Sequence, residues 1–455
     1  MKYLAIDIGA SSGRHIVGWL EDGKINLKEV YRFANGAQSK DGHLTWNAAR
    51  LVAEVVNGLK AAAEQGYKPD YIGIDTWAVD YALLDGDGQI IGDIYSYRDD
   101  RTQKVISAVH RRMPFGQLYA RTGIQFQPFN TIYQLYSDKK NDRLDGAAGF
   151  LMLPDYLNYR LTGVKKQEYT NATSTGMVNA STHCWDGDIL DAIGYDKSLF
   201  GELSQPGTVV GTLSAEVQRQ VGYNATVVLP ATHDTASAVL AAPIEFGQAY
   251  KSSGTWSLLG VEQKTAHTDE GSRNANYSNE GSIGFNFRYQ KNIMGLWMLQ
   301  SIRKELNNIP FTDLANLARG RLGGYLVDVN DSRFLSPRSM SAEIRAAVGR
   351  ELGTASLVRT VYVSLALSYK RAIEELEANT GAKYSSINII GGGCRDALLN
   401  ELTAKATGKK VITGPVEATA TGNIIMQMIS AGEIQNISSA RNIIKNSFNI
   451  SEVEA

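Results

Sequence analysis

Two aspartates stand where a carboxylate could take part in phosphate or proton chemistry. The first, Asp7, comes near the end of an apolar run and precedes the small-residue turn Gly9-Ala10-Ser11-Ser12-Gly13. The backbone N–H groups and hydroxyls of such a turn can close around phosphate oxygens. A carboxylate beside a phosphate repels it unless a divalent cation lies between them, so Asp7 predicts Mg²⁺. An ordinary tight hairpin with a surface aspartate explains these residues equally well.

The second aspartate, Asp234, follows the apolar run Val227 to Leu229 in the segment Thr232-His233-Asp234-Thr235. A carboxylate here could accept the proton of a sugar hydroxyl as that hydroxyl attacks a γ-phosphate. The position also suits the N-cap of a helix from Thr235 to Leu240. Both interpretations stay open, and one residue can serve both roles.

Two further segments of small residues occur in the second half of the chain. Ser252-Ser253-Gly254-Thr255 predicts a second hairpin turn, and Gly391-Gly392-Gly393 lies between a strand and a helix that starts near Asp396. A glycine triplet lets a flat group or a phosphate approach the backbone closely. The triplet alone is weak evidence, but both hairpins and the triplet in this order favour a nucleotide site.

The elements around these segments repeat one layout. The first half reads as three strands, a helix with Asn47 as its N-cap and a further strand. The second half reads as two strands, a long helix and a strand before the triplet. The expected ranges are Tyr3 to Ile8, Arg14 to Leu20, Ile25 to Phe33, Leu51 to Ala62, Tyr71 to Asp75, Ala249 to Ser252, Trp256 to Glu262, Leu357 to Leu376 and Ser386 to Ile390.

This repeated layout predicts an α/β protein made of two copies of one domain that face each other across a cleft. The length of 455 residues also exceeds that of one ordinary core. We expect the boundary near Pro243 to Gly247. The predicted domains are residues 1–244, with the first phosphate hairpin and the sugar site, and residues 245–455, which bind the nucleotide.

Two motif matches point elsewhere and are rejected. Gly9 to Gly13 fits the G-x-S-x-G pattern of a hydrolase nucleophile, but that pattern needs a helix directly afterwards, and Arg14 to Leu20 reads as a strand. Gly18 to Lys24 spells most of a P-loop, but Ile25 stands where a Ser or Thr should bind magnesium. A hydrolase therefore ranks behind the other hypotheses.

The composition excludes several classes of protein. Hydrophobic residues make up 43% of the chain, charged residues 20%, and the net charge is -1. Nothing here favours nucleic acid or an anionic membrane as a partner. The apolar run at the N-terminus is broken at Asp7, so it does not indicate a signal peptide. Two distant cysteines, Cys184 and Cys394, indicate a reducing compartment, and we expect the protein in the cytoplasm.

The sequence resembles the FGGY carbohydrate kinases over nearly its whole length. The segments that carry the resemblance include DIGASSGR at Asp7, IGIDTWAVD at Ile72, HDTASAV at His233, NIMGLW at Asn292 and IGGGCRD at Ile390. The glycine and acid positions are shared across the family. Four of these segments (DIGASSGR, IGIDTW, HDTASAV and NIMGLW) point more specifically to the branch that acts on L-rhamnulose.

The resemblance implies two ribonuclease-H-like domains with an actin-like layout. It implies the use of ATP and Mg²⁺ to phosphorylate the terminal hydroxyl of a ketose, which gives L-rhamnulose 1-phosphate in rhamnose catabolism. Asp234 matches the family's catalytic base. The positions that match its ATP contacts are Ala10, Ser11, Ser12, Gly13, Arg14, Thr255, Gln300 and Gly392, and those that match its sugar contacts are Ala78, His233, Asp234, Thr235 and Asn292.

One position departs from the branch, because residue 78 is usually Gly there and is Ala here. A sugar that packs against this Cα would meet a slightly smaller pocket, so another ketose, such as L-fuculose or a xylulose, stays an alternative. An alternative of a different class is a non-catalytic, actin-like nucleotide switch. Such a switch would keep the phosphate hairpins without needing a base at Asp234 or a polar sugar pocket.

Overall fold

The computed structural model describes residues 1–321 and 323–455, which divide into two compact units. The first unit comprises Met1–Ala241, Gln263–Tyr289 and Thr419–Ser447, and the second comprises Ala242–Glu262, Gln290–Ala418 and Phe448–Ala455. Both units are discontinuous in sequence. A single boundary between residues 244 and 245 therefore stays a prediction about how the chain is organised.

The first unit is built on a mixed six-stranded sheet in the order β12-β13-β6-β1-β2-β3. Smaller sheets of two and three strands join β7 to β9, β10 to β11, and β4, β5 and β8. Its elements are β1 (Tyr3–Ile8), β2 (Ser12–Glu21), β3 (Lys24–Ala34), β4 (Gln38–Lys40), β5 (His43–Trp46), α1 (Ala48–Glu64), β6 (Tyr71–Thr76), β7 (Tyr81–Leu84), β8 (Ile94–Tyr95), η1 (Asp100–Thr102), α2 (Ile106–Arg112), α3 (Phe115–Thr122), α4 (Thr131–Lys140), β9 (Gly149–Met152), α5 (Leu153–Thr162), β10 (Gln167–Glu168), α6 (Tyr169–Thr173), α7 (Gly187–Ile193), η2 (Lys197–Leu199), β11 (Leu203–Ser204), β12 (Val209–Thr212), α8 (Ala215–Val221), β13 (Thr226–Val228), α9 (Asp234–Leu240), α10 (Glu270–Asn274), β16 (Ser278–Gly281), η3 (Ile283–Phe285) and α17 (Ile437–Ser447), with most of α16 (Ala418–Ser430).

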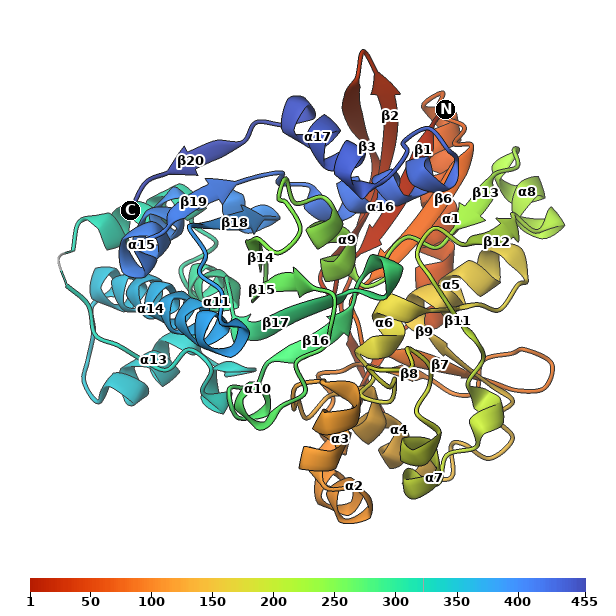
Figure 1. The fold of residues 1–455 in the computed structure, drawn as a ribbon, viewed down its shortest axis with the longest axis horizontal. Helices are drawn as coiled ribbons and strands as arrows, with labels where there is room; N and C mark the ends of the chain where they lie inside the picture. The colour runs from red at the N-terminus through yellow and green to blue at the C-terminus, as the bar shows by residue number, and fades with distance from the viewer. Residues whose placement is uncertain (322) are drawn as a thin grey trace. The chain divides into compact units, whose positions relative to one another are not determined.

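Helices cover both faces of this sheet, because the strand alternation sends side chains to opposite sides. His15 on β2 packs against Gly58 of α1, whereas Gly18, an odd number of residues away, packs against Ile424 of α16 (Figure 1). Helix α1 begins where the sequence predicts, with the Asn47 side chain accepting a hydrogen bond from the backbone N–H of Arg50 at 2.9 Å. The sheet is therefore buried on both faces, as its apolar strands require.

The two rejected motifs lie where the sequence analysis places them. Strands β1 and β2 form an antiparallel hairpin in which Ile8 pairs with Gly13, so no helix follows the G-x-S-x-G segment. The turn between β2 and β3 contains the P-loop-like residues, with Glu21 paired to Lys24. Neither segment has the strand–loop–helix geometry that its motif needs.

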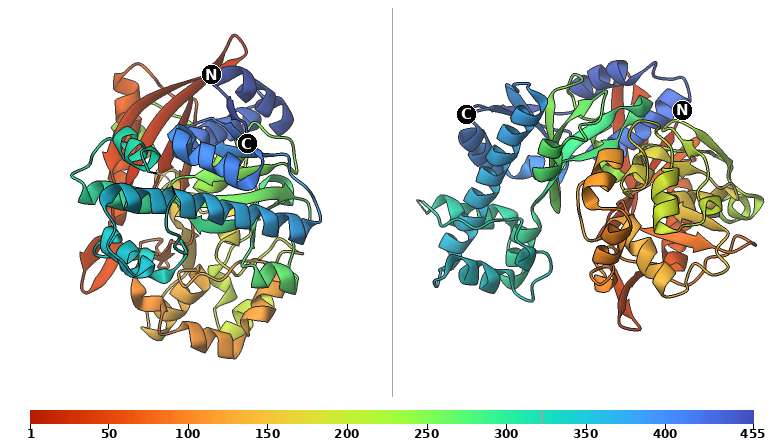
Figure 2. Two further views of the ribbon diagram at one scale, coloured as in Figure 1. Left: turned by 90° about the vertical axis from the view of Figure 1, so that its left-hand side faces the viewer. Right: turned by 60° about the horizontal axis from the view of Figure 1, so that its bottom comes forward.

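The second unit holds most of a seven-stranded sheet in the order β16-β17-β15-β14-β18-β19-β20. Figure 2 shows α14 beside it as one long continuous helix. Its elements are β14 (Ala249–Ser253), β15 (Trp256–Gln263), β17 (Phe287–Met294), α11 (Trp297–Glu305), α12 (Phe311–Arg319), η4 (Ser332–Phe334), α13 (Met340–Val348), α14 (Thr354–Thr380), β18 (Ser386–Ile390), η5 (Gly392–Arg395), α15 (Ala397–Thr407), β19 (Lys410–Thr413) and β20 (Ser451–Val453).

The repeated layout predicted from the sequence is confirmed. In the first unit β1 pairs antiparallel with β2 and parallel with β6, and in the second β14 pairs antiparallel with β15 and parallel with β18. The helix after the glycine triplet is α15, whose N-cap Asp396 accepts from the N–H of Leu399. Both units therefore have the α/β fold that the sequence predicts.

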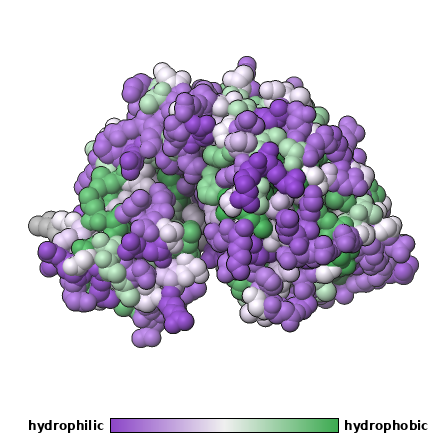
Figure 3. Space-filling model, turned by 90° about the horizontal axis from the view of Figure 1, so that it is seen from below, coloured by the Kyte–Doolittle hydropathy of each residue, from purple (hydrophilic) through white to green (hydrophobic). Residues whose placement is uncertain are grey.

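The outer surface matches the composition. Hydrophilic residues cover most of the face shown in Figure 3, and hydrophobic residues form small separate patches on it. Among the described residues, no helix is long and apolar enough to cross a membrane.

The packing of α16 against α9 gives a test of the first unit. A Cβ at Gly422 would lie 1.8 Å from the carbonyl oxygen of Ser237, which is backbone and has no freedom to move aside. Replacing glycine by alanine in a helix normally stabilises by about 1 kcal/mol, but overpacking of this kind costs roughly 1–3 kcal/mol or more. We expect Gly422→Ala to lower the free energy of unfolding in urea. Gly36→Ala, where the added Cβ meets no atom within 4 Å, serves as the control. A Gly422→Ala protein as stable as the control would contradict this packing.

Candidate active site

The strand register of the first unit gathers three separate segments at one edge of its sheet. Parallel pairing places Asp7 of β1 beside Asp75 of β6. Just beyond them Thr76 forms a β-bridge with His233, and its N–H donates to the carbonyl of Thr232 at 2.9 Å. This edge is formed by the carboxyl ends of parallel strands, where ligands of α/β proteins usually bind. The two aspartates singled out in the sequence, Asp7 and Asp234, therefore belong to the same edge.

The turn after β1 is held by the end of β3. The N–H of Gly9 donates to the carbonyl of Ser12 at 2.9 Å, while Asn35 donates through its side chain to the carbonyl of Gly9 and through its N–H to the carbonyl of Ser11. A Cβ at Gly13 would lie 2.2 Å from the ring of Phe33, so this position has no room for a side chain. Sequence reasoning missed Asn35, although it is what fixes the turn.

The carboxylates at this edge are partly neutralised by neighbours. Arg14 donates to Asp7 at 2.5 Å. Asp75 is fully buried, and its one satisfied oxygen accepts from the Asn423 side chain of α16 at 2.5 Å. Burial and the nearby carboxylate of Asp7 raise the pKa of Asp75 well above its ordinary value, with Asp234 adding to the effect. The edge thus crowds carboxyl groups whose negative charges disfavour one another, and Asp75 favours its neutral form.

A divalent cation fits this chemistry. Mg²⁺ prefers oxygen ligands and is commonly held by one or two carboxylates together with phosphate oxygens and water. Asp7 and the unsatisfied buried oxygen of Asp75 supply such donors. Among the described residues, no group of three or more His, Cys, Asp or Glu side chains is arranged to hold a metal by itself. Such a cation would therefore need a phosphate to complete its ligands.

Asp234 does not cap a helix. Helix α9 begins at Asp234 itself, and the N-cap residue is His233, which makes no side-chain capping hydrogen bond. The interpretation of Asp234 as the N-cap of a helix from Thr235 to Leu240 is therefore wrong. Its side chain is 32% exposed, and one oxygen, Oδ1, accepts from the hydroxyl of Thr235 at 3.1 Å. The carboxylate is available for chemistry outside the helix.

A buried glutamate fixes the chain just before His233. The carboxylate of Glu168 accepts from the N–H of Thr232 at 3.2 Å and from its hydroxyl at 2.7 Å. Burial raises the pKa of Glu168, while hydrogen bonds from Thr170 and Thr232 favour its charged form. Asn171, from the helix that follows Glu168, also donates through its side chain to the carbonyl of Thr232 at 3.4 Å. The position of His233 is thus set by a polar network that sequence reasoning missed.

The loop that contains Ala78 is strained and tightly held. Val79 has a φ of 68°, which is costly for a β-branched residue. Its carbonyl accepts from the side chains of Thr131 and Gln134, and Asp80 accepts from the indole N–H groups of its neighbouring tryptophans. Burial raises the pKa of Asp80 to about 6, although these indoles oppose the shift. Ala78 therefore sits on a backbone that cannot easily adjust.

In the second unit the glycine triplet packs against the β14–β15 turn. A Cβ at Gly393 would lie 2.0 Å from the hydroxyl of Ser253, and Gly391 has a φ of 82°. No atom lies within 4 Å of the position that a Cβ would take at Gly392, so that residue is open to a ligand.

The other predicted residues of this unit lie on adjoining elements. The N–H groups of Leu296 and Trp297, at the start of α11, donate to the carbonyls of Gly254 and Thr255. Gln300 lies one turn further along that helix, and Asn292 lies on β17. The β14–β15 turn, which contains Thr255, thus contacts both the start of α11, which carries Gln300, and the glycine triplet, which contains Gly392.

Two family models together match most of the chain. The model of the N-terminal domain of the FGGY family of carbohydrate kinases matches residues 2–241, and that of the C-terminal domain matches residues 249–431. This chain belongs to the FGGY family of carbohydrate kinases. The family predicted from the sequence segments is therefore confirmed, and with it the activity class of a sugar kinase.

Curated relatives match the chain over nearly its whole length. It is 44% identical to the rhamnulokinase of Oceanobacillus iheyensis, over 98% of this chain and 97% of that protein. It is 46% identical to the rhamnulokinase of Halalkalibacterium halodurans, over 99% of this chain and 98% of that protein.

Solved structures of a xylulose kinase and a glycerol kinase share the fold. A xylulose kinase from Lactobacillus acidophilus aligns with a TM-score of 0.81 at 18% identity, over 100% of this chain and 93% of that one. A glycerol kinase from Plasmodium falciparum aligns with a TM-score of 0.77 at 13% identity, over 99% and 93%. At such identities the likeness concerns the fold alone.

The absence of a cap at Asp234 gives a stability prediction for this FGGY kinase. Asp234→Ala removes no capping bond and relieves repulsion with Asp75, so we expect the free energy of unfolding to change by no more than about 0.5 kcal/mol. Ser214→Ala is the matched control, because Ser214 does cap its helix, α8, by accepting from the N–H of Val217. Loss of that cap should cost about 1 kcal/mol. Equal losses in the two variants, measured by urea denaturation, would restore the cap interpretation for Asp234.

Proposed function

We propose that this chain transfers the γ-phosphate of ATP to the terminal hydroxyl of L-rhamnulose, giving L-rhamnulose 1-phosphate and ADP. The family supports a carbohydrate kinase, and the rhamnulokinases with which the chain shares 44% and 46% identity support this ketose. We further propose that the enzyme acts in the cytoplasm, with the sugar and ATP as its partners rather than nucleic acid or a membrane. L-Fuculose and a xylulose remain the alternative substrates.

The observation that supports the mechanism is the carboxylate of Asp234, which caps no helix and lies at the same sheet edge as Asp7. A sugar hydroxyl is a poor nucleophile at neutral pH. As its oxygen forms the bond to the γ-phosphorus, the bond from phosphorus to the bridging oxygen of ADP breaks, and the hydroxyl proton passes to Asp234. General-base help of this kind is typically worth ~10²–10⁴-fold. Positioning and charge neutralisation supply the rest of the acceleration.

The remaining site residues would bind ATP, the sugar or Mg²⁺. Ala10, Ser11, Ser12, Gly13 and Arg14 of the first turn would bind ATP, as would Thr255, Gln300 and Gly392 of the second unit. Ala78, His233, Thr235 and Asn292 would bind the sugar. Asp7 would hold Mg²⁺, which when bound offsets the negative charge of the β- and γ-phosphates. The buried hydrogen bond from Asn423 keeps Asp75 in place beside it.

The substrate assignment is tested by ADP release in the presence of single ketoses. We expect kcat/KM for L-rhamnulose to exceed that for L-fuculose, D-xylulose and L-xylulose by at least about tenfold, since pocket shape discriminates on this scale. Phosphorus NMR should place the phosphate on C1. Ala78→Gly restores the residue that is usual in the branch at this position. Because it enlarges the proposed sugar pocket without touching the reacting groups, it should change KM for the ketose more than kcat.

Either of two results would overturn the proposal. Faster turnover of another ketose would replace L-rhamnulose as the substrate. A folded protein that releases no ADP with any ketose would favour the non-catalytic nucleotide switch.

The role of Asp234 is tested separately. Asp234→Asn keeps the shape of the side chain but cannot take the proton, so kcat should fall by ~10²–10⁴-fold while sugar affinity changes little. The control is Glu216→Gln, which neutralises an exposed acid in the first turn of α8. If the kcat of Asp234→Asn equals that of Glu216→Gln, the assignment of Asp234 as the general base is wrong.

A further inference from the structure

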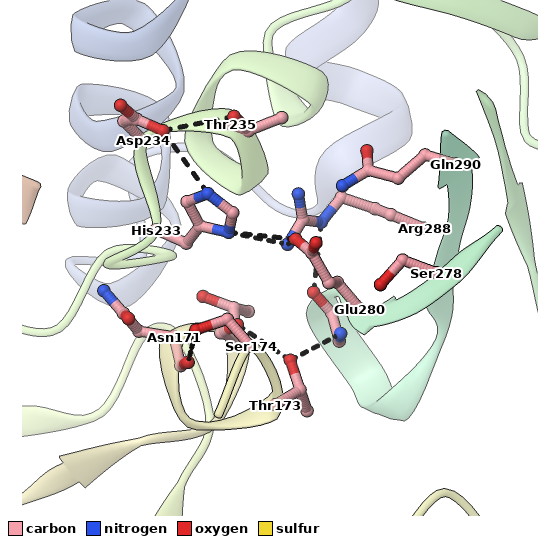
Figure 4. Close-up of polar contacts among 12 residues, drawn as sticks. Asn171, Thr173, Ser174, His233, Asp234, Thr235, Ser278, Glu280, Arg288 and Gln290 are labelled. Atoms are coloured by element: carbon pink, nitrogen blue, oxygen red, sulfur yellow. Dashed lines mark hydrogen bonds and ion pairs between the residues drawn. The ribbon is translucent and has the colours of Figure 1, made fainter. Parts of the chain in front are cut away.

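Arg288 and Glu280 form a buried ion pair directly behind the proposed sugar-binding histidine. Arg288 is fully buried and lies on β17, while Glu280 is on β16, and the two meet at 3.0 Å between Nη2 and Oε2. Figure 4 shows the imidazole of His233 between this pair and the carboxylate of Asp234. Removing the charge of a guanidinium from water costs several kcal/mol, so a fully buried one needs a compensating partner. Neither Arg288 nor Glu280 belongs to the sites proposed above.

The ring nitrogen Nδ1 of His233 faces one donor and one acceptor. It lies 3.2 Å from Nη2 of Arg288 and 3.1 Å from Oε2 of Glu280. The other ring nitrogen, Nε2, lies 3.5 Å from Oδ1 of Asp234. A neutral imidazole has one nitrogen that carries a hydrogen and one that does not. Nδ1 therefore cannot both accept a hydrogen bond from Arg288 and donate one to Glu280.

The guanidinium of Arg288 beside Nδ1 and the carboxylate of Asp234 beside Nε2 favour the same tautomer. A hydrogen on Nδ1 would leave Nε2 as a bare acceptor that faces a second acceptor, in a site that already holds the carboxylates of Asp7 and Asp75. A hydrogen on Nε2 instead points toward Asp234 and leaves Nδ1 to accept from Arg288. If the ring takes up a second proton, Nδ1–H donates to Glu280, and the hydrogen on Nε2 stays where it was.

We propose that Arg288 is a positioning residue for the phosphoryl transfer, acting on Asp234 through His233. By donating to Nδ1 it keeps a hydrogen on Nε2, which faces Oδ1 of Asp234. The hydroxyl of Thr235 donates to that same oxygen at 3.1 Å. Both contacts fall on Oδ1, so Oδ2 is the oxygen that takes the proton of the sugar hydroxyl. Glu280 compensates the buried charge of Arg288.

The network that holds Arg288 supports this role. Its Nε donates to the carbonyl of Gly281 at 3.1 Å, and the N–H of Gly281 donates to the hydroxyl of Thr173 at 2.8 Å. A Cβ at Gly281 would lie 2.5 Å from the ring of Tyr169, so the backbone is closely packed there. The guanidinium therefore has a fixed place, as a group that orients another side chain requires.

The first test reads the hydrogen position directly and does not depend on activity. Long-range ¹H–¹⁵N NMR of the wild-type protein, with the signal assigned by comparison with His233→Gln, should show hydrogen on Nε2 and none on Nδ1 of the neutral ring. In Arg288→Met the acceptor Glu280 still lies 3.1 Å from Nδ1, where no guanidinium now donates, so a hydrogen should appear on Nδ1. Because Arg288→Met leaves Glu280 without this partner, the double variant Arg288→Met/Glu280→Gln is measured beside it.

The second test is kinetic and rests on the proposed function. A misplaced reacting group can cost ~10²-fold in rate, so kcat with L-rhamnulose should fall by up to that factor in Arg288→Met, with a smaller change in KM. Arg288→Lys should recover part of the loss. Arg273→Met, which removes a half-exposed arginine paired with Glu270, should keep the wild-type kcat.

The outcomes separate the two proposals. A wild-type ring with its hydrogen on Nδ1, or a folded Arg288→Met protein with wild-type kcat, would overturn the role of Arg288 and leave the kinase function untouched. Wild-type protein that turns over no ketose would overturn the proposed function, whichever tautomer the spectrum shows.

Discussion

The parallel pairing of β1 with β6 is the constraint on which the site of the first unit depends. It fixes Asp7 beside Asp75, and the bridge between Thr76 and His233 extends the same register to the segment that contains Asp234. Strands of this kind are buried on both faces, and a slip of one residue would turn every side chain to the opposite face. The apolar residues that hold the register, such as Ile6 and Ile74, are therefore as necessary to the chemistry as the carboxylates.

Gathering carboxylates at one buried edge has an electrostatic cost, and the structure meets it in two different ways. Arg14 forms an ion pair with Asp7, whereas Asp75 accepts a hydrogen bond from the neutral amide of Asn423. The side-chain amide of Asn423 is itself oriented by Gln427, one turn further along α16, which donates to the Asn423 oxygen at 2.7 Å. The raised pKa of Asp75 reports that the negative charge is under-compensated. A site built in this way gains most from a ligand that brings a cation with it.

Much of the framework could be predicted from the sequence, because it depends on local patterns. The hairpins, α1 with its Asn47 cap and the Gly391–Gly393 segment follow from residue types a few positions apart. The cap interpretation that this local reasoning gave for Asp234 was wrong, because the helix begins one residue earlier than expected and Asp234 is its first residue. The backbone just before it is fixed instead by Glu168, which holds Thr232 from 64 residues earlier in the chain. Contacts such as those of Arg288 with His233, or the strained φ of Val79, arise only from tertiary packing and leave no periodic signal.

The two units show how one layout can carry two chemistries. In each, a first strand pairs antiparallel with its hairpin partner and parallel with a later strand. The first unit places Asp7 and Asp75 at the ends of those strands, whereas the second places Ser253 and the glycine triplet there. A buried basic residue on β14, Lys251, packs against the ring of Tyr369, and burial lowers its pKa to about 7. The edge of the first unit therefore presents carboxyl groups. The edge of the second unit presents a serine and glycines, and it is open at Gly392. Because the backbone pairing is the same in both, the difference lies entirely in the side chains at the strand ends. A repeated fold can thus present different side chains at the same strand ends without changing its topology.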